Sequence, residues 1–443
     1  MHVHFIAIGG AAMHNLAMEL AARKHYTVTG SDDEIFDPAL SRLREAGLLP
    51  KQMGWHPENI TADIDAVILG MHARKDNPEL LRAEELGIPV YSFPQYLYEQ
   101  TKDKTRIVVA GSHGKTTTTA MILYVLRALG IETDYMVGAQ IEGFERMVRL
   151  SDTARYAVFE GDEYLTSPLD PRSKFLWYKP HVAIMTGIAW DHINVFPTWD
   201  SYVDTFRQFT RTISGTLIWF RHDATLAALA AENEQRITCL PYDAYNGNVP
   251  MQVFGQHNMQ NLQAACLACQ QIGIEPEVFY EKIASFTGAS NRLEKIAESA
   301  DFVAYKDFAH SPSKLRATIN AVRERYPERT LIACMELHTF SSLTADFLPQ
   351  YKDTMSEADE QIVYFNQHVI EHKHLAPITV DDVKQAFGSN RLQVYTDSRK
   401  MEEDLLRKDY RNTALLLMSS GTFDGINVKD LAQTIQHNLQ NTK

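Results

Sequence analysis

Residues 106–130 read RIVVAGSHGKTTTTAMILYVLRALG, and this stretch decides the fold of the middle of the chain. RIVVA (106–110) is a short β-branched run typical of a buried strand, and MILYVLRALG (121–130) predicts a helix. A glycine-rich turn between a strand and a helix predicts a phosphate-binding loop, because backbone N–H groups and the helix N-terminus then face one anion. The loop consists of Gly111, Ser112, His113, Gly114, Lys115, Thr116 and Thr117.

Two side chains of this loop have specific expected roles. Lys115 is placed to reach the β- and γ-phosphates of a nucleotide, and the Thr116 hydroxyl is placed to bind Mg²⁺. The loop departs from a complete Walker A sequence, since Val109 stands where the first glycine would be. We expect ATP as the ligand, and the alternative is a strand–turn–helix unit that binds nothing.

The same alternation of strand-like and helical patterns continues in both directions from this loop, which predicts α/β domains with parallel sheets. Polar TKDKT (101–105) and turn-rich FTGASNRLE (286–294) are the expected linkers. The chain is therefore predicted to form three α/β domains, over residues 1–104, 105–290 and 291–443. The predicted strands outside the loop are 3–10, 27–32, 66–70, 90–93, 156–160, 181–188, 301–308, 329–337, 361–366, 392–397 and 413–420. Helical patterns cover 11–25 and 261–273.

Composition places the chain among ordinary globular proteins. Its 443 residues are 45% hydrophobic and 22% charged, which excludes disorder and fits two to four domains. The net charge of −13 argues against nucleic acid as a partner, because that needs a basic face. The apolar stretch 5–20 is interrupted by glycines, His14 and Asn15, so neither a membrane span nor a signal peptide is expected. Four cysteines indicate a reducing compartment, and we expect a cytoplasmic protein.

Acidic residues follow two predicted strands of the middle domain. Glu160 ends one strand and precedes Asp162 and Glu163, while Asp191 and His192 follow the next strand. In an open parallel sheet the carboxyl ends of strands form the ligand crevice, so these groups could gather beside the loop and hold a metal. The alternative is a set of solvated loop charges.

A second glycine turn lies near the N-terminus, after the first strand. Gly9, Gly10, Ala11, Ala12 and Met13 occupy the place of a dinucleotide fingerprint, but the outer glycines are missing. Asp32 ends the second strand, about where a ribose-contacting acid is expected. A nucleotide other than NAD and a purely structural turn are both open.

Cys266 and Cys269 lie in an apolar helix without a second ligand pair, so we expect buried helix cysteines rather than a zinc site.

Taken together, these motifs resemble the Mur ligase family. The resemblance rests on the loop at 111–117, on Glu160, on Asp191-His192, on GQHNMQN (255–261), on NRLE (291–294) and on DFAH (307–310), and it covers nearly the whole chain. IGGAAM (8–13) and TGSD (29–32) are similar to the members that use UDP-N-acetylmuramate itself.

This resemblance implies an N-terminal Rossmann-like UDP-binding domain, a central P-loop ATPase-like domain and a C-terminal Rossmann-like domain. It implies an ATP-dependent, acyl-phosphate-forming ligase in which Lys115, Glu160 and His192 are catalytic. Metal ligands would be Thr116, Glu160 and His192, with Mg²⁺ as the ion. Further ATP contacts are implied at His257, Asn258, Arg292, Asp307 and His310, with closure of the third domain over the nucleotide, and UDP-sugar contacts at Gly9, Gly10, Ala11, Ala12, Met13 and Asp32.

Two features bear on the acceptor. EGDEY (160–164) followed by SPLDPRSKF (167–175), and MSSGTFDGI (418–426), are similar to the murein peptide ligases, which implies the recycled tripeptide L-Ala-γ-D-Glu-meso-diaminopimelate as acceptor. L-alanine is the alternative acceptor. The chain departs from the family at Leu337-His338, where the pattern has Pro-Arg, at Ser311, where a second His is common, and at Arg207, near the place of a carbamylated lysine in sister ligases.

Three readings from other classes remain. A UDP-sugar-binding protein without catalysis would not need an intact Lys115, Thr116, Glu160 and His192. An NAD-dependent oxidoreductase is supported only by the N-terminal turn. A folate-type polyglutamate ligase shares the central domain but not the N-terminal one. The sequence leaves the oligomeric state open.

Overall fold

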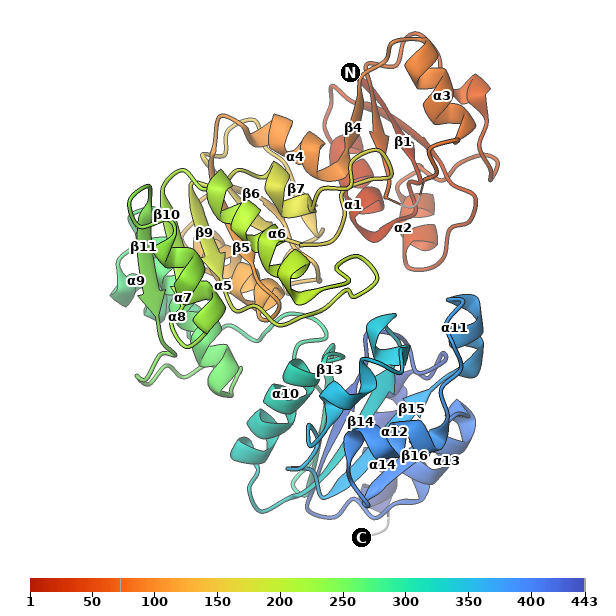
Figure 1. Cartoon of the computed structure of the whole chain (residues 1–443), viewed down its shortest axis with the longest axis vertical. Coiled ribbons are helices and arrows are strands. Elements are labelled where there is room, and N and C mark those ends of the chain that lie inside the picture. The colour runs from red at the N-terminus through yellow and green to blue at the C-terminus, as the bar shows by residue number, and fades with distance from the viewer. Residues whose placement is uncertain (72, 442–443) are drawn as a thin grey trace. The chain divides into compact units, whose positions relative to one another are not determined.

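The strands described by the structure form three sheets, each flanked by helices, which confirms the α/β class (Figure 1). The coordinates are a computed structural model that describes residues 1–71 and 73–441. No helix in that part of the chain is long and apolar enough to cross a membrane.

The first sheet is fully parallel, with the strand order β2-β1-β3-β4. Local sequence fixes where its later helices begin: the Asn77 side chain caps α3, and Ser92 with Gln95 forms a capping box at the start of α4. The strands are β1 (His2–Ile6), β2 (Thr27–Ser31), β3 (Ala66–Leu69) and β4 (Val90–Ser92). The helices are α1 (Ala11–Ala21), α2 (Ala39–Glu45), the 3-10 turn η1 (Pro57–Asn59), α3 (Pro78–Glu85) and α4 (Phe93–Thr101).

The second sheet has seven strands in the order β11-β10-β9-β5-β8-β6-β7, all parallel except β7. Because β5 lies between β8 and β9, the loops that leave these three strands surround one point. The strands are β5 (Thr105–Ala110), β6 (Thr133–Met136), β7 (Val148–Arg149), β8 (Tyr156–Glu160), β9 (Val182–Met185), β10 (Thr216–Phe220) and β11 (Thr238–Tyr242). The helices are α5 (Lys115–Ala128), the 3-10 turn η2 (Lys174–Trp177), α6 (Trp199–Thr212), α7 (Ala224–Ala231), α8 (Gln256–Gln270) and α9 (Pro276–Ile283).

The third sheet has six strands in the order β12-β13-β17-β14-β15-β16, with only β12 antiparallel to its neighbour. The strands are β12 (Glu294–Glu298), β13 (Phe302–Asp307), β14 (Thr330–Leu337), β15 (Glu360–Phe365), β16 (Leu392–Tyr395) and β17 (Thr413–Met418). The helices are α10 (Pro312–Arg325), α11 (Gln367–His372), α12 (Val380–Phe387), α13 (Ser398–Arg407) and α14 (Val428–Asn441), with 3-10 turns η3 (Ser341–Leu343) and η4 (Leu348–Tyr351).

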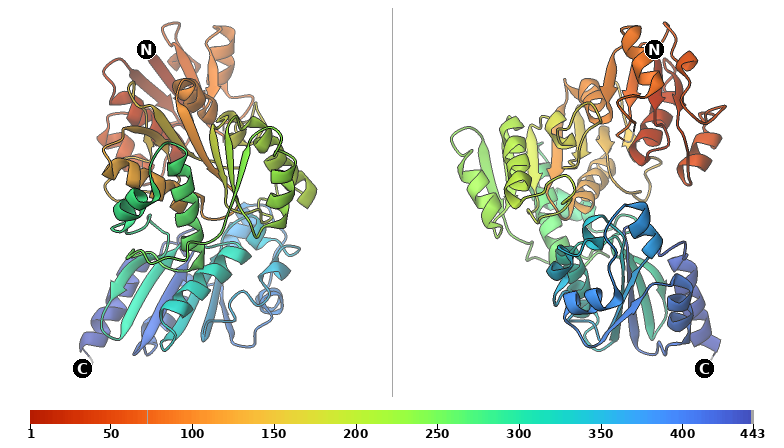
Figure 2. Two further views of the ribbon diagram at one scale, coloured as in Figure 1. Left: turned by 90° about the vertical axis from the view of Figure 1, so that its left-hand side faces the viewer. Right: turned by 45° about the vertical axis from the view of Figure 1, so that its right-hand side comes forward.

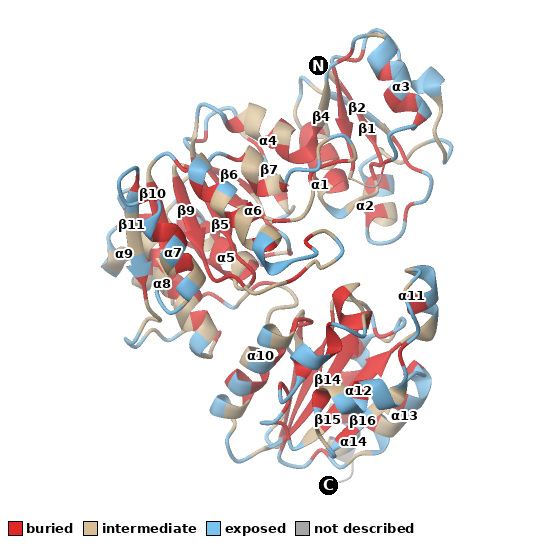
Figure 3. Ribbon diagram, viewed as in Figure 1, coloured by how far each residue is buried: buried red, intermediate tan, exposed pale blue. Residues whose placement is uncertain are grey.

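Both faces of the third sheet are buried under helices (Figures 2 and 3). Along its central strands β13, β14, β15 and β17, alternate residues belong to opposite cores. In β14, Ala333 and Met335 pack in the core under α10 and α12, whereas Ile332 and Cys334 pack under α13 and α14. A strand buried on both faces is expected to be largely apolar, which explains the apolar run 331–335 of β14.

The chain folds into two compact units. The first holds 1–188, 203–243 and 263–284, and the second holds 189–202, 244–262 and 285–443. The chain thus crosses from one unit to the other several times, and the domain limits expected at 104 and 290 stay predictions.

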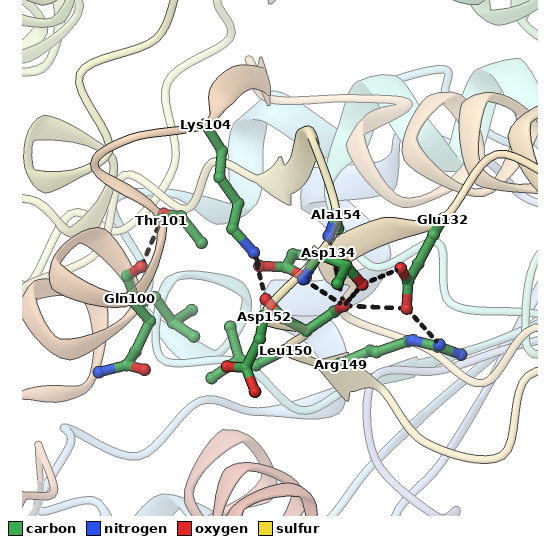
Figure 4. A network of polar contacts seen from close by, with 12 residues as sticks. Gln100, Thr101, Lys104, Glu132, Asp134, Arg149, Leu150, Asp152 and Ala154 are labelled. Carbon is green, nitrogen blue, oxygen red and sulfur yellow. Dashed lines mark hydrogen bonds and ion pairs between the residues drawn. The ribbon is translucent and has the colours of Figure 1, made fainter.

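Within the first unit, polar contacts tie the first sheet to the second. Lys104, between α4 and β5, donates to Asp134 of β6 at 2.5 Å and to the Ser151 carbonyl (Figure 4). Glu19 of α1 accepts from Arg146 at 2.8 Å and from the Leu150 amide at 3.1 Å. These buried or half-buried bonds fix α1 and the end of α4 against the β6–β7 region.

Candidate functional site

The loop predicted to bind phosphate follows β5 and begins α5, as its sequence requires. Gly111 has φ +120°, and an added Cβ would clash with the Thr186 hydroxyl and lie 2.8 Å from the Thr186 amide nitrogen. Gly114, at φ +68°, is the N-cap of α5. The Ser112 amide donates to the Gly187 carbonyl at 2.8 Å. Both glycines therefore stand where a side chain is excluded by conformation or space.

Thr116 and Glu160, predicted from separate motifs, are in direct contact. The Thr116 hydroxyl donates to Glu160 Oε1 at 2.8 Å, and the Gly138 amide donates to Oε2 at 2.6 Å. A Cβ on Gly138 would lie 2.9 Å from the carboxylate oxygens, so a larger residue here would displace the Glu160 carboxylate. A hydroxyl and a carboxylate side by side are hard oxygen donors of the kind that Mg²⁺ prefers.

Lys115 faces a row of carboxylates. Its Nζ donates to Glu163 Oε2 at 2.7 Å, and both side chains are largely buried, at 16% and 2% exposure. Burial lowers the pKa of Lys115, but the fields of Glu163, Asp162 and Glu160 outweigh it, so the net pKa is raised. The loop lysine is thus held as a cation at the phosphate-binding end of β5.

Asp162 has a partner of its own in the segment that follows. Its Oδ2 accepts from Lys174 Nζ at 2.6 Å, and its Oδ1 accepts from the Tyr164 amide at 3.1 Å. Burial raises the pKa of Asp162, but the charges of Lys174 and Lys115 outweigh this and the net pKa is lowered. Asp162 is therefore ionised beside two cations.

His192 and Asp191 lie in the second unit, so the structure does not place them against Glu160. His192 has φ +55°, and its amide donates to Asp191 Oδ1 at 2.8 Å. Asp191 Oδ2 lies 3.8 Å from His310 Nε2. Burial raises the pKa of Asp191, but His310, His192 and Lys314 together lower it far below its usual range. Asp191 and His310, predicted from different motifs, are thus neighbours.

The other residues predicted around ATP also belong to the second unit. Asp307 accepts from the amides of Leu293 and Ala309, each at 2.7 Å, and so fixes the turn that carries Arg292. The Arg292 guanidinium stacks on Phe308 at 4.6 Å.

His257 and Asn258 form the first turn of α8, which begins at Gln256 rather than at the expected residue 261. Burial lowers the pKa of His257, and the field of Asp307 partly offsets this, which places these two groups within electrostatic reach.

At the N-terminal turn, Asp32 folds back onto the glycines. Its Oδ2 accepts from the Gly9 amide at 2.7 Å, and burial raises its pKa to about 6, an effect that the Gly9 hydrogen bond partly opposes. Asp32 therefore supports the turn itself, and a contact to ribose stays a prediction. Gly10 is the N-cap of α1, whose first residues are Ala11, Ala12 and Met13.

The structure also bears on the predictions for the two helix cysteines, for Arg207 and for a metal site. Cys266 and Cys269 are buried in α8, as predicted. Arg207 lies on α6 and pairs at 3.0 Å with Glu232, the C-cap residue of α7. Within residues 1–71 and 73–441, no three His, Cys, Asp or Glu side chains are gathered closely enough to hold a metal by themselves.

Two features of the structure were not predicted from the sequence. One is the pairing of Glu163 with Lys115. The sequence alone does not distinguish Glu163 from the neighbouring acidic residues, because the choice depends on the backbone turn. The other is Glu336, buried at the end of β14, which accepts from the Phe423 amide at 2.8 Å and lies 3.5 Å from His338 Nδ1. A Cβ on Gly421 would lie 2.7 Å from His338, so Glu336, His338 and the turn after β17 form one cluster.

Family models and relatives of known name match most of the chain. Residues 2–105 match the model of the Mur ligase family, catalytic domain, and residues 109–239 match the Mur ligase middle domain. The UDP-N-acetylmuramate–L-alanine ligase of Limosilactobacillus reuteri is 31% identical over 81% of this chain and 84% of its own.

A second relative spans nearly the full length. The UDP-N-acetylmuramate–L-alanyl-γ-D-glutamyl-meso-2,6-diaminoheptandioate ligase of Haemophilus influenzae is 29% identical over 97% of this chain and 98% of its own. Among solved structures, a murein peptide ligase from Psychrobacter arcticus superimposes with a TM-score of 0.68, at 24% identity, over 98% of both chains.

Proposed function

The chain belongs to the Mur ligase family of ATP-dependent ligases, and we propose that it joins UDP-N-acetylmuramate to L-Ala-γ-D-Glu-meso-diaminopimelate in peptidoglycan recycling, in the cytoplasm. The nearly full-length match to the Haemophilus influenzae ligase supports this acceptor. The observation that carries the chemistry is the contact of Thr116 with Glu160 beside Lys115, at the end of β5.

In this reaction the carboxylate of UDP-N-acetylmuramate attacks the γ-phosphorus of ATP, which gives an acyl phosphate and ADP. The acceptor amine then attacks the acyl carbon, the C–O bond to phosphate breaks, and inorganic phosphate leaves. Lys115 would stabilise charge on the transferring phosphoryl group, and the amides of 111–117 would hold the phosphate oxygens. Positioning and charge neutralisation are most of the catalysis in such a transfer.

We assign Mg²⁺ to Thr116 and Glu160, and we propose His192, from the resemblance to the family, as a ligand of a second cation. The paired hydroxyl and carboxylate fit a hard cation. When bound, Mg²⁺ would neutralise phosphate charge.

The remaining proposed contacts are to the nucleotide and the UDP-sugar. The turn at the start of α1 offers backbone N–H groups to the diphosphate of UDP-N-acetylmuramate. The ATP contacts proposed in the second unit are His257, Asn258, Arg292, Asp307 and His310.

The deciding experiment measures ADP release from the purified protein with Mg²⁺, ATP and UDP-N-acetylmuramate, with either the tripeptide or L-alanine as acceptor. We expect turnover with the tripeptide. Turnover with L-alanine alone would make the protein a synthetic ligase, the candidate that the 31% identity to the Limosilactobacillus reuteri enzyme favours. Absence of turnover with both would support a UDP-sugar-binding protein.

The first prediction concerns Lys115. Lys115→Ala removes the cation proposed to stabilise the transferring phosphoryl, and we expect kcat to fall by about 10²- to 10³-fold. Retention of full ATP-dependent ligation would show that the loop has another role. Lys102→Ala is the control, because Lys102 is exposed and pairs only at the surface with Glu99.

The second prediction concerns His192. His192→Ala should lower activity and shift the Mg²⁺ dependence to higher concentration, because one ligand of the second cation is lost. The measurement is initial rate against Mg²⁺ concentration at saturating ATP. Unchanged activity and unchanged metal dependence would remove His192 from the metal site.

A further inference from the structure

Glu163 forms an ion pair with Lys115, and the ammonium group of Lys115 is the one that we propose binds the nucleotide phosphates. Lys115 is the first residue of α5, and Glu163 is the third residue after β8, which pairs directly with β5. The Nζ–Oε2 distance is 2.7 Å, and the Glu163 side chain is only 2% exposed. The carboxylate therefore stands where it neutralises the loop lysine from inside the protein.

A buried pair of this kind makes nucleotide binding an exchange. A phosphate group that approaches Lys115 competes with Glu163 for the same ammonium, since both are oxyanions. Breaking a buried pair is costly when one charge is left uncompensated. ATP binding to the wild-type chain must therefore overcome the Glu163 contact, which lowers the apparent affinity.

The segment after Glu163 is a closed loop whose base lies at this pair. The Lys174 amide donates to the Tyr164 carbonyl at 2.9 Å, and the Thr166 amide donates to the Arg172 carbonyl at 2.9 Å. Lys174 also holds Asp162 at 2.6 Å. Asp162 and Glu163 are adjacent in the chain, so a shift of Glu163 away from Lys115 acts on the base of loop 164–174.

Trp177, at the end of η2, contacts this loop and can report on its movement. Trp177 Nε1 donates to Asp170 Oδ2 at 2.8 Å, and the Arg172 guanidinium stacks on the Trp177 ring at 4.5 Å. Any rearrangement of loop 164–174 changes the polar surroundings of this indole.

We propose that Glu163 is a positioning residue that occupies Lys115 until the phosphates of ATP replace its carboxylate, and that this exchange moves loop 164–174. The inference rests on the proposed role of Lys115 in ATP binding. It makes the loop responsive to the nucleotide, so that the segment that follows the EGDEY motif differs between the free and the ATP-bound chain.

The first test is the affinity for a non-hydrolysable ATP analogue, measured by calorimetry with Mg²⁺. Glu163→Gln removes the competing charge at nearly the same volume, and we expect the Kd to fall by roughly three- to tenfold. Glu163→Asp restores the carboxylate and should return the Kd toward the wild-type value. A residue with a merely structural role would weaken binding or leave it unchanged when replaced.

Glu132→Gln is the matched control, since Glu132 is another ion-paired glutamate of the same unit but is 41% exposed and pairs with Arg149. Its Kd should equal that of the wild type. An unchanged or raised Kd in a folded Glu163→Gln variant overturns the proposal.

The second test needs no variant at Glu163 and so holds even if that variant does not fold. Adding the analogue to the wild-type protein should change the tryptophan emission, and Trp177→Phe should abolish that change while binding the analogue with the same Kd. A change that persists in Trp177→Phe, or no change in the wild type at saturation, overturns the movement of the loop. If the wild-type chain binds no analogue, the proposed function and this inference both fall; if it binds and Glu163→Gln binds equally, only the inference falls.

Discussion

Gly111 shows how a single residue sets the geometry of the phosphate-binding loop. Its φ of +120° and its approach to Thr186 leave no room for a Cβ. Gly111→Ala should destabilise the protein by about 3 kcal/mol, because backbone strain and overlap with Thr186, directly after β9, add, and it should weaken ATP binding as well. The measurement is the free energy of unfolding in urea together with the Kd for an ATP analogue.

Gly47 provides the matched control for this substitution. It also has a positive φ, +69°, but nothing lies within 4 Å of an added Cβ. Gly47→Ala should cost only about 1 kcal/mol, from backbone strain alone, and leave the ATP affinity unchanged. Equal costs at the two positions would show that the Thr186 contact relaxes freely.

For single residues, the sequence predicted which side chains belong to the site better than it predicted which residues those side chains contact. Lys115, Thr116 and Glu160 could be selected because a glycine turn and two strand ends restrict where they point. The pairing of Lys115 with Glu163 rather than Asp162 depends on the backbone turn after Glu160, and three acids within four positions carry no signal for that choice. The contact of Asp32 with Gly9 was likewise hidden, since the same sequence suits a ribose contact or a structural one.

Among elements, most central strands and the edge strands β2, β4 and β16 were predicted, whereas five other strands were missed. β5, β8, β14 and β17 are buried on both faces and read as continuous apolar runs. The edge strands β7, β11 and β12 are short, partly exposed or interrupted by Pro241, so they lack this pattern. The next strands inward, β6 and β10, were missed as well. The first helix was expected to reach His25, but α1 ends at Ala21.

β6 contains a group whose titration should be visible in stability. Burial raises the pKa of Asp134 to about 6, although its ion pair with Lys104 opposes this (Figure 4). The folded state then binds a proton more tightly than the unfolded state, so this group's contribution to stability falls as the pH rises from about 4 to 6. Relative to Asp134→Asn, the wild type should lose about 2 kcal/mol between pH 4.5 and 7. The measurement is urea unfolding of both proteins at the two pH values.

Glu132, close to Asp134, supplies a control of opposite sign. Hydrogen bonds from Thr153 and Ser151 lower the pKa of Glu132, so its contribution to stability grows as the pH rises through the usual range of a glutamate. The gap between the wild type and Glu132→Gln should therefore widen in favour of the wild type from pH 4.5 to 7. The same trend for both variants would refute the assignment of the effect to burial of Asp134.

At the scale of the whole molecule, the sequence located three sheets but not the path of the chain between units. Every strand of the third sheet falls within 294–418, inside the range predicted for the third domain. Segments 189–202 and 244–262 nevertheless belong to the same unit as that sheet. Ile193 and Phe254 pack against its core, and Phe254 meets the Tyr305 ring edge-on at 5.5 Å. Turn residues indicate where a linker lies, but they do not indicate against which core an isolated Phe or Ile packs.

This organisation predicts how the chain responds to being cut at the expected boundary. Fragment 291–443 contains the complete sheet and both of its helical layers, so it should unfold in urea as one cooperative transition. Fragment 1–290 should bind a hydrophobic dye and self-associate, because Ile193 and Phe254 lose the core that covers them. Replacing both by Ser in fragment 1–290 should reduce dye binding, whereas Leu81→Ser, at a residue already 46% exposed in the intact chain, should change it little. A monodisperse, dye-free fragment 1–290 would mean that segments 189–202 and 244–262 are covered within the fragment, and that the third sheet is not what buries them.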